Sequence, residues 1–297
     1  ELTSGAARLS LAHAGAEPTA WSIGGTDLLW RADPAAWAQT APILFPVVGW
    51  TRGGRIRHRG KTYPLGLHGF AASQLFEPVD ATADSARLRL AASAATRALY
   101  PFEFRLDAVY QLEPRALTWT LEATNLGDEP MPYALGLHPG FCWPLAGSGE
   151  THSFAFDRLE HADIPIIAPG GLFSPERRAI PLDGRRLALT PELMAEEALC
   201  FLDIESRGAV FDNGAGARLR IELDDFPHIA LWARPPAPFL CIEAWTGHGD
   251  PVGFAGELSE KPSMRLLAPG ETGRHCARFS LEMDAPRADR LGAAAAV

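Results

Sequence analysis

Two histidines recur in nearly the same local sequence. The tetrapeptide Leu-Gly-Leu-His occupies residues 65–68 and again residues 135–138, and both copies are followed closely by Gly and Phe. Chance, an internal duplication or a shared site would each explain the repeat. Because imidazole changes its charge near neutral pH, two imidazoles directed at one site could transfer protons and donate hydrogen bonds there. We therefore treat His68 and His138 as candidate active-site residues.

A carboxylate interrupts the apolar stretch at residues 239–245. If this stretch is a strand, Glu243 shares one face with Phe239, Cys241 and Trp245. Burying a carboxylate is costly unless it is paired or used. Burial also raises its pKa, which suits a general base that works near neutral pH. A salt bridge to a core arginine is the alternative, and we favour a catalytic or ligand-binding Glu243.

A basic cluster occupies residues 51–61. It contains four arginines and one lysine without any acidic residue. At the period of a strand, Arg55, Arg57 and Arg59 share one face. The cluster is either the solvated face of an exposed hairpin, which we favour, or an anion site for a phosphorylated sugar, since guanidinium groups match phosphate oxygens.

The composition is that of a globular protein. Of the 297 residues, 47% are hydrophobic and 21% are charged. A net charge of −9 argues against binding to nucleic acids or anionic membranes, and no apolar run is long enough to span a bilayer. The first residues do not resemble a signal peptide. The four cysteines (Cys142, Cys200, Cys241 and Cys276) form no CxxC pair, so we expect reduced thiols, no metal site and a cytoplasmic protein.

Alternation of apolar and polar residues predicts an all-β fold. It is clear at residues 86–90, 102–106, 117–123 and 217–223, and Gly-rich or Asn/Asp-Gly turns separate such segments. The 25 prolines discourage long helices. We expect a large antiparallel β-sandwich or barrel forming a single domain over residues 1–297, with a frayed tail at about 286–297.

Several short segments, in this order, resemble the aldose 1-epimerase (galactose mutarotase) family, in the short bacterial branch similar to the lactose-operon LacX protein. They are residues 41–49 (Ala-Pro-Ile-Leu-Phe-Pro-Val-Val-Gly), 60–63 (Gly-Lys-Thr-Tyr), 68–70 (His-Gly-Phe), 138–141 (His-Pro-Gly-Phe), 241–247 (Cys-Ile-Glu-Ala-Trp-Thr-Gly), 260–262 (Glu-Lys-Pro) and 267–271 (Leu-Ala-Pro-Gly-Glu). The resemblance runs along nearly the whole chain. It implies a large antiparallel β-sandwich, with the sugar bound in an open cleft on one face.

The resemblance also implies the roles of three residues. Glu243 matches the catalytic base, His138 the acid that protonates the ring oxygen, and His68 a histidine that binds sugar hydroxyls. The implied enzyme is a cofactor-independent isomerase, an aldose 1-epimerase, whose partner is a small sugar. The chain carries no GxGxxG, Walker or HExxH motif. Trp143 and Trp245 either stack on sugar faces or pack in the core.

Two departures from the family pattern concern sugar binding. Trp50 stands where relatives usually have an arginine, and Arg52 would reach the same face if the strand stays regular. Glu197 stands near a position where relatives tend to have an aspartate. We therefore expect Arg52 and Glu197 to bind substrate.

Other activities remain open at this point. A hexose-6-phosphate 1-epimerase would use the same histidines and glutamate with arginines on the phosphate. A non-catalytic sugar-binding or sensor protein would keep the cleft without the activity. A glycoside hydrolase needs two carboxylates, and only one strong candidate is present. We expect a monomer or homodimer.

The proposed chemistry predicts a geometry. Glu243 and His138 should lie on the order of 5–7 Å apart in the empty site, because each must hydrogen-bond one oxygen of the same hemiacetal. Together with His68, they should project from strands toward an open cleft.

Overall fold

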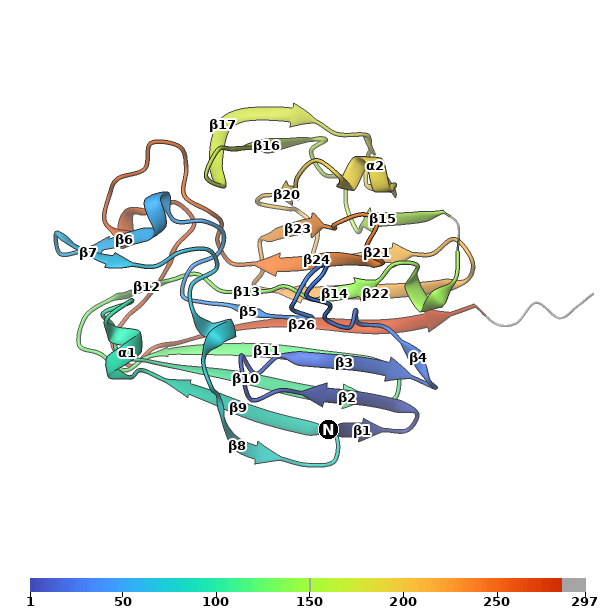
Figure 1. Cartoon of the computed structure of the whole chain (residues 1–297), viewed down its shortest axis with the longest axis horizontal. Helices are drawn as coiled ribbons and strands as arrows, with labels where there is room; N and C mark the ends of the chain where they lie inside the picture. The colour runs from blue at the N-terminus through green and yellow to red at the C-terminus, as the bar shows by residue number, and fades with distance from the viewer. Residues whose placement is uncertain (150, 285–297) are drawn as a thin grey trace, which may run out of the picture.

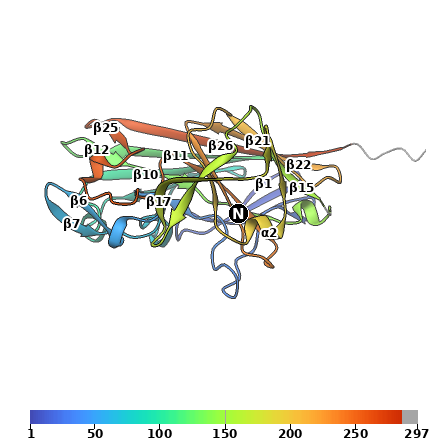
Figure 2. The ribbon, with the colours of Figure 1, turned by 90° about the horizontal axis from the view of Figure 1, so that it is seen from above.

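A ten-stranded antiparallel sheet forms one layer of the protein. The computed structural model describes residues 1–149 and 151–284. In chain order, the strands of the sheet are β8 (Glu77–Ala81), β9 (Ser85–Ala91), β10 (Phe104–Glu113), β11 (Ala116–Asn125), β15 (His152–Phe156), β18 (Leu182–Asp183), β19 (Arg186–Leu189), β21 (Gly208–Asp212), β22 (Ala217–Asp224) and β26 (Thr272–Met283). Their spatial order is β18-β19-β15-β21-β22-β26-β11-β10-β9-β8. Seen from above, β26, β11 and β10 run side by side along one face (Figure 2).

A six-stranded sheet forms the layer that carries the site. Its strands are β5 (Ile43–Leu44), β13 (Gly136–Leu137), β14 (Gly140–Cys142), β20 (Leu199–Phe201), β23 (His228–Trp232) and β24 (Phe239–Trp245). The order is β20-β23-β24-β13-β5, and β14 also pairs with β24. Strand β24 therefore lies at the centre of this sheet (Figure 1).

Smaller elements complete the fold. A four-stranded sheet contains β1 (Leu2–Ser4), β2 (Ala7–Leu11), β3 (Pro18–Ile23) and β4 (Thr26–Asp27), and its first two strands contact β10. The two-stranded pairs are β6 (Arg55–His58) with β7 (Lys61–Pro64), β12 (Met131–Tyr133) with β25 (Arg265–Leu267), and β16 (Asp163–Ala168) with β17 (Leu172–Ala179). The α-helices are α1 (Ala94–Arg97) and α2 (Pro191–Met194), and the 3₁₀ turns are η1 (Arg52–Gly54), η2 (Ala71–Ser73), η3 (Leu145–Gly147) and η4 (Leu258–Glu260). None of the described helices has the length and apolar character needed to cross a bilayer.

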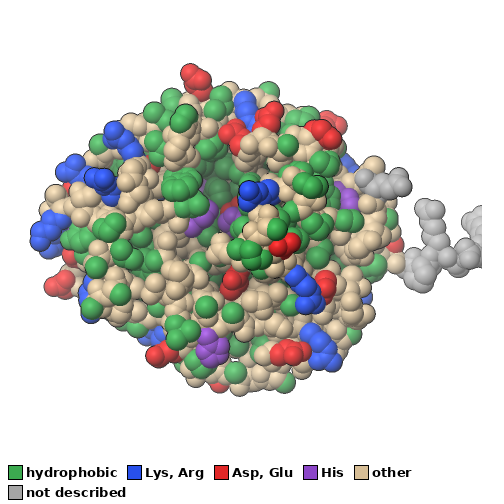
Figure 3. Space-filling model, in the orientation of Figure 1, with side chains coloured by type: hydrophobic (Ala, Val, Ile, Leu, Met, Phe, Trp, Pro, Cys, Tyr) green, Lys and Arg blue, Asp and Glu red, His purple; other side chains and the backbone are tan. Residues whose placement is uncertain are grey.

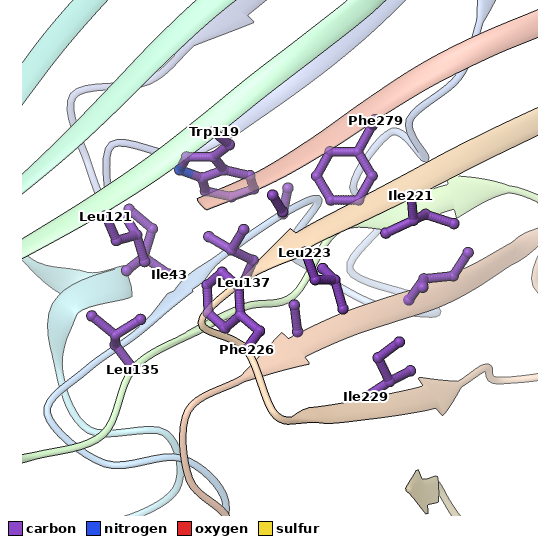
Figure 4. Close-up of a cluster of buried hydrophobic side chains, with 14 of the residues drawn as sticks. Ile43, Trp119, Leu121, Leu135, Leu137, Ile221, Leu223, Phe226, Ile229 and Phe279 are labelled. Carbon is purple, nitrogen blue, oxygen red and sulfur yellow. The ribbon is translucent and has the colours of Figure 1, made fainter. Parts of the chain in front are cut away.

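The main hydrophobic core lies between the two large sheets. Figure 4 shows side chains from one sheet meeting side chains from the other. The ten-stranded sheet contributes Trp119, Leu121, Ile221, Leu223 and Phe279, and the six-stranded sheet contributes Ile43, Leu137 and Ile229. One cluster of buried hydrophobic side chains contains residues from nearly the whole described sequence, the first being Leu2 and the last Leu281. The predicted antiparallel β-sandwich, formed as a single domain, is therefore confirmed, whereas the predicted frayed tail at 286–297 lies outside the described residues.

Alternation places the core residues as the sequence predicts. In β22, Ala217, Leu219, Ile221 and Leu223 are buried, and the residues between them are partly or fully exposed. Strand β24 differs, because all its residues are buried. Its even-numbered residues join the main core, while its odd-numbered residues face the opposite way, toward smaller apolar clusters. The outer face of the six-stranded sheet is therefore covered as well, and Glu243 belongs to it.

Candidate active site

A cavity of about 560 Å³ lies over the outer face of the six-stranded sheet. Figure 3 shows it as a hollow near the middle of this face, with histidine side chains inside. Glu243, His138, His68 and Glu197 all line it. Much of the remaining wall is aromatic, from Trp37, Trp50, Phe70, Phe173, Trp232 and Trp245. Four of the five predicted site residues therefore meet in one cavity of a size typical for small-molecule sites.

Glu243 and His138 are brought together by strand pairing. Leu137 of β13 is opposite Ala244 of β24, and pairing resumes where Gly140 of β14 faces Cys241. His138 lies in the gap between these two short strands, beside Glu243. Because Leu137 points into the main core, the alternation of the chain turns His138 to the outer face. The two side chains thus meet on that face.

The acid and base candidates are closer than expected. His138 Nε2 lies 3.2 Å from Glu243 Oε2, so the predicted separation of 5–7 Å is wrong. Side chains on neighbouring strands that share one face have Cβ atoms only about 5 Å apart. The carboxylate and the imidazole therefore contact each other directly.

Burial opposes charge on both partners. Glu243 is 2% exposed and His138 is 7% exposed. Burial raises the pKa of Glu243 well above its ordinary value, although the Trp245 indole N–H, which donates to Oε2 at 3.0 Å, favours the carboxylate. Burial lowers the pKa of His138 well below its ordinary value, and a positive charge on His68 would lower it further. The neutral acid and the neutral imidazole are thus both favoured over isolated charges.

His68 reaches the cavity from a loop. We had expected it to project from a strand. It lies between β7 and η2 with a left-handed φ of +60°. The Gly49 N–H donates to His68 Nδ1 at 3.1 Å. Nδ1 is therefore the acceptor, and the proton of the neutral ring is on Nε2. The ring lies edge-on to His138, with centroids 5.6 Å apart, so the repeated tetrapeptide does bring two imidazoles to one site.

Glu197 lies at the wall of the cavity, but its carboxylate is already engaged. Arg178 Nε donates to Oε1 at 2.9 Å, and the Ile167 N–H donates to Oε2 at 3.3 Å. The sequence gives no sign of Arg178, because it follows Glu176 and Arg177 in a charged run typical of an exposed strand. Arg178 Nη2 is buried without a hydrogen-bond partner among the described residues.

Arg52, which we expected to reach the same face and bind substrate, does not line the cavity that contains Glu243 and His138. The chain does not stay extended after Trp50, because η1 forms there and Gly53 adopts a φ of +64°. The exposed Arg52 instead lines a separate pocket of about 380 Å³ together with Arg55 and Arg57. Its Nη1 donates to the Phe254 carbonyl at 3.0 Å. A regular strand was the premise of the prediction, and the glycines at positions 53 and 54 break it.

A model of the aldose 1-epimerase family matches residues 1–280. The chain belongs to the aldose 1-epimerase family. Among curated members, the plasmid-encoded protein LacX of Lactococcus lactis subsp. lactis is 30% identical over 262 residues, which cover 84% of this chain and 88% of LacX. The resemblance inferred from the short motifs is therefore confirmed.

Solved structures related to this family have the same fold. A galactose mutarotase related enzyme from Lactobacillus acidophilus superposes with a TM-score of 0.86 at 25% identity, covering 96% of this chain and 99% of the other. A galactose mutarotase-like protein from Lactobacillus casei gives a TM-score of 0.88 at 25% identity, with 95% and 99% covered. The similarity thus extends over the full sandwich.

Aromatic side chains that the sequence did not single out surround His138 in this family member. The rings of Trp37 and Trp232 lie 5.1 Å and 5.8 Å from that of His138. Of the two tryptophans considered for stacking, Trp245 lines the cavity, whereas Trp143 lines a different pocket beside His152. Nothing near Trp37 or Trp232 in the sequence distinguishes them from core residues.

Metal ligands are not part of this geometry. Across residues 1–149 and 151–284, no group of three or more His, Cys, Asp or Glu side chains is arranged to hold a metal ion. All four cysteines have free thiols, and burial raises the pKa of Cys200, the cysteine that lines the cavity, well above its ordinary value. The cavity brings together the carboxyl groups of Glu243 and Glu197 and the imidazoles of His68 and His138.

Proposed function

We propose that this protein is an aldose 1-epimerase that interconverts the α and β anomers of an uncharged free aldose. The observation that carries the proposal is the contact between His138 Nε2 and Glu243 Oε2, at 3.2 Å, in the wall of the sugar-sized cavity. Membership of the aldose 1-epimerase family supports a reaction at the anomeric carbon.

The reaction needs one base and one acid close together. Ring opening removes the proton of the C1 hydroxyl, breaks the bond between C1 and the ring oxygen, and protonates that oxygen. Glu243 takes the hydroxyl proton and His138 gives a proton to the ring oxygen. Because both oxygens are bonded to C1, their partners must be neighbours, as these two side chains are. After the aldehyde turns, the two roles reverse and the ring closes on its other face.

The buried pair is suited to this exchange. An imidazolium with a carboxylate holds the same number of protons as an imidazole with a carboxylic acid. The first state starts ring opening and the second accompanies the open sugar. Burial works against the charged state, as the shifted pKa values of His138 and Glu243 indicate. The two states are thereby brought closer in free energy, which favours proton transfer in both directions.

His68 and Glu197 bind the sugar in this proposal. Since His68 Nδ1 accepts from Gly49, its Nε2–H is the group that can donate to a sugar oxygen. Glu197 lines the cavity and accepts from sugar hydroxyls beside the hydrogen bonds that orient it. The aromatic wall offers faces for the apolar side of the pyranose ring.

The lining of the cavity favours an uncharged substrate. No Lys or Arg side chain of the described residues lines it. The arginines that a phosphate would require gather instead at the edge of the molecule near β6 and β7, in a pocket of their own (Figure 3). A phosphorylated hexose would therefore meet no Lys or Arg among the described residues that line the cavity beside Glu243 and His138.

Polarimetry tests the proposal. Fresh α-anomers of several aldoses, free and 6-phosphorylated, are mixed with the protein, and the approach to the equilibrium rotation is compared with the spontaneous rate. We expect acceleration for at least one free aldose. Acceleration confined to a 6-phosphate sugar would assign the protein to the phosphorylated substrates. Binding by calorimetry without acceleration would make it a sugar-binding protein.

A further inference from the structure

An ion pair is buried behind the cavity wall. Lys261 is 3% exposed and Asp250 is 4% exposed, and Lys261 Nζ lies 3.0 Å from Asp250 Oδ1. Neither residue takes part in the acid–base chemistry described above. Removing two charges from water is expensive, and apolar residues of similar size often stabilise a protein as well or better. Stability alone therefore gives a weak reason for this pair.

Asp250 holds the chain segment that follows Gly49. Its backbone N–H donates to the Trp50 carbonyl at 2.8 Å. Its Oδ2 accepts from the Arg52 N–H, also at 2.8 Å. One aspartate thus contacts the segment at two points, and Trp50, whose carbonyl is one of them, has its side chain in the wall of the sugar cavity.

The same segment orients His68. Gly49 and His68 exchange two hydrogen bonds: the Gly49 N–H donates to Nδ1 at 3.1 Å, and the His68 N–H donates to the Gly49 carbonyl at 3.0 Å. A Cβ at Gly49 would approach the Gly249 backbone to 2.7 Å, so the 49–52 segment packs tightly on the chain that carries Asp250. A movement of Asp250 would therefore be transmitted to His68.

We propose that Lys261 and Asp250 are positioning residues of the sugar site: they fix residues 49–52 so that His68 keeps Nδ1 as an acceptor and presents Nε2–H to the substrate. The role assigned to His68 rests on the proposed function, whereas its orientation and tautomer do not. A merely structural pair would leave both unchanged when removed without unfolding.

The positive charge of Lys261 also favours the neutral form of His68. Burial lowers the pKa of His68 to about 4, and the ammonium of Lys261 contributes to this lowering. Other titratable groups near the ring are His138 and Glu243, which line the same cavity, and Asp250, which pairs with Lys261. A neutral His68 is required, since a proton on Nδ1 would face the Gly49 N–H.

Two double variants separate the contact from the charge. Asp250→Asn with Lys261→Met keeps an oxygen for the Arg52 N–H but removes both charges. Asp250→Leu with Lys261→Met removes the oxygen too. Neither leaves an unpaired buried charge, so both are expected to fold. Replacing the exposed pair of Arg97 and Glu103, 2.8 Å apart, by Met and Gln is the matched control.

The primary measurement is ¹⁵N NMR of the His68 ring across pH, assigned with a His68→Asn variant, because asparagine tolerates a positive φ. We expect the Asn/Met variant to keep the wild-type tautomer and to raise the pKa of His68. The Leu/Met variant should also lose the single tautomer. If His68 keeps both its tautomer and its pKa in a folded Leu/Met variant, the proposal is overturned.

Mutarotation gives the second measurement. At pH 7 the Asn/Met variant should lose no more than about threefold in kcat/KM, because it keeps the oxygen that accepts from the Arg52 N–H. The Leu/Met variant should lose on the order of 10²-fold, since a small misplacement of a binding group has effects of that size. If the wild-type protein shows no mutarotation, the proposed function fails, and the NMR result still decides the role of the pair.

Discussion

At the scale of single residues, the site depends on a carboxylate and an imidazole that are buried together. Their contact at 3.2 Å leaves Glu243 Oε1 without a hydrogen bond among the described residues, whereas Oε2 accepts from Trp245. A sugar hydroxyl therefore has a free carboxylate oxygen to approach. Because the partners titrate as a pair, changes to either one should alter both the rate and its pH dependence.

Replacing the base tests the assignment most directly. Glu243→Gln preserves the shape of the side chain but cannot accept the C1 hydroxyl proton. We expect kcat of mutarotation to fall by about 10²–10⁴-fold, with little change in sugar affinity measured by calorimetry. Glu77→Gln, on an exposed position of β8, is the control. Retention of most of the activity by Glu243→Gln would end the assignment.

The pH profile of kcat/KM should be bell-shaped. Adding a proton to the pair removes the base, and the lowered pKa of His138 sets this acid limb below pH 6.5. Removing the shared proton leaves no group that can act as the acid. The raised pKa of Glu243 places this alkaline limb well above pH 4.5, the ordinary pKa of a glutamate. Initial rates between pH 4 and 10 check the shape, and the residual activity of Glu243→Gln should lack the acid limb, because no base is left to be protonated. A profile flat over the whole range would contradict a coupled pair.

The sequence was informative where a residue conflicts with its surroundings. Glu243 could be found because a carboxylate in an apolar strand is expensive, and His68 and His138 because their settings repeat. Arg178 and Trp232 look ordinary in the chain, since their importance arises from neighbours that are distant in sequence. The distance between His138 and Glu243 depends on the register of their strands. A shift of one residue in that register would move one of the two side chains to the opposite face of the sheet.

At the scale of elements, long strands were predictable and short ones were not. Alternation identified the segments that became β9, β11 and β22, where one face is buried over many residues. Strands β5 and β13 have only two residues each, too few for a period to be seen. Yet these short strands lie beside the cavity. His138 lines it from the break in the chain between β13 and β14.

The β6–β7 hairpin should be dispensable for chemistry on uncharged sugars. Arg55 and Arg57 are exposed, and the nearest acid to Arg57 is Glu257 at 3.9 Å. The double variant with alanine at both positions should keep its mutarotase activity on free aldoses. Its free energy of unfolding should change by less than about 1 kcal/mol, as expected for exposed charges. A loss confined to a 6-phosphate sugar would instead assign the cluster to phosphate binding.

The turn between β16 and β17 should control the position of Trp50. Gly170 and Gly171 both have positive φ, +85° and +73°. A Cβ on Gly171 would overlap the Trp50 ring, whereas a Cβ on Gly170 meets only Leu172 at 3.9 Å. Gly171→Ala should therefore displace Trp50 and lower kcat/KM by roughly tenfold to a hundredfold.

Gly170→Ala is the matched control for that variant, because it carries a similar backbone cost of about 1–3 kcal/mol without the overlap. Steady-state kinetics of both variants separates the effect of backbone strain from the effect of displacing the Trp50 ring. Equal kinetics for the two variants would show that Trp50 has no part in sugar binding.

At the scale of the whole molecule, one core stabilises both large sheets and so supports the site from behind. Leu121 on β11 is fully buried and packs between the sheets (Figure 4), and it does not line the cavity. Leu121→Ala should lower the free energy of unfolding by about 2–5 kcal/mol, measured by urea titration. The activity per folded molecule should remain, since the outer face of β24 is unaffected. A cost below about 1 kcal/mol would mean that the two layers are less interdependent than the shared cluster indicates.

Strand β26 has a consequence for synthesis of the protein. Its residues Thr272–Met283 come last among the described strands, yet they lie between β22 and β11 near the middle of the ten-stranded sheet. A nascent chain therefore emerges from the ribosome with both neighbouring strands holding open edges. Such edges recruit other chains into aggregates. A chain truncated before Thr272 would lack the strand that pairs with both β22 and β11, so we expect it to aggregate on synthesis, whereas the chain that includes β26 closes both edges.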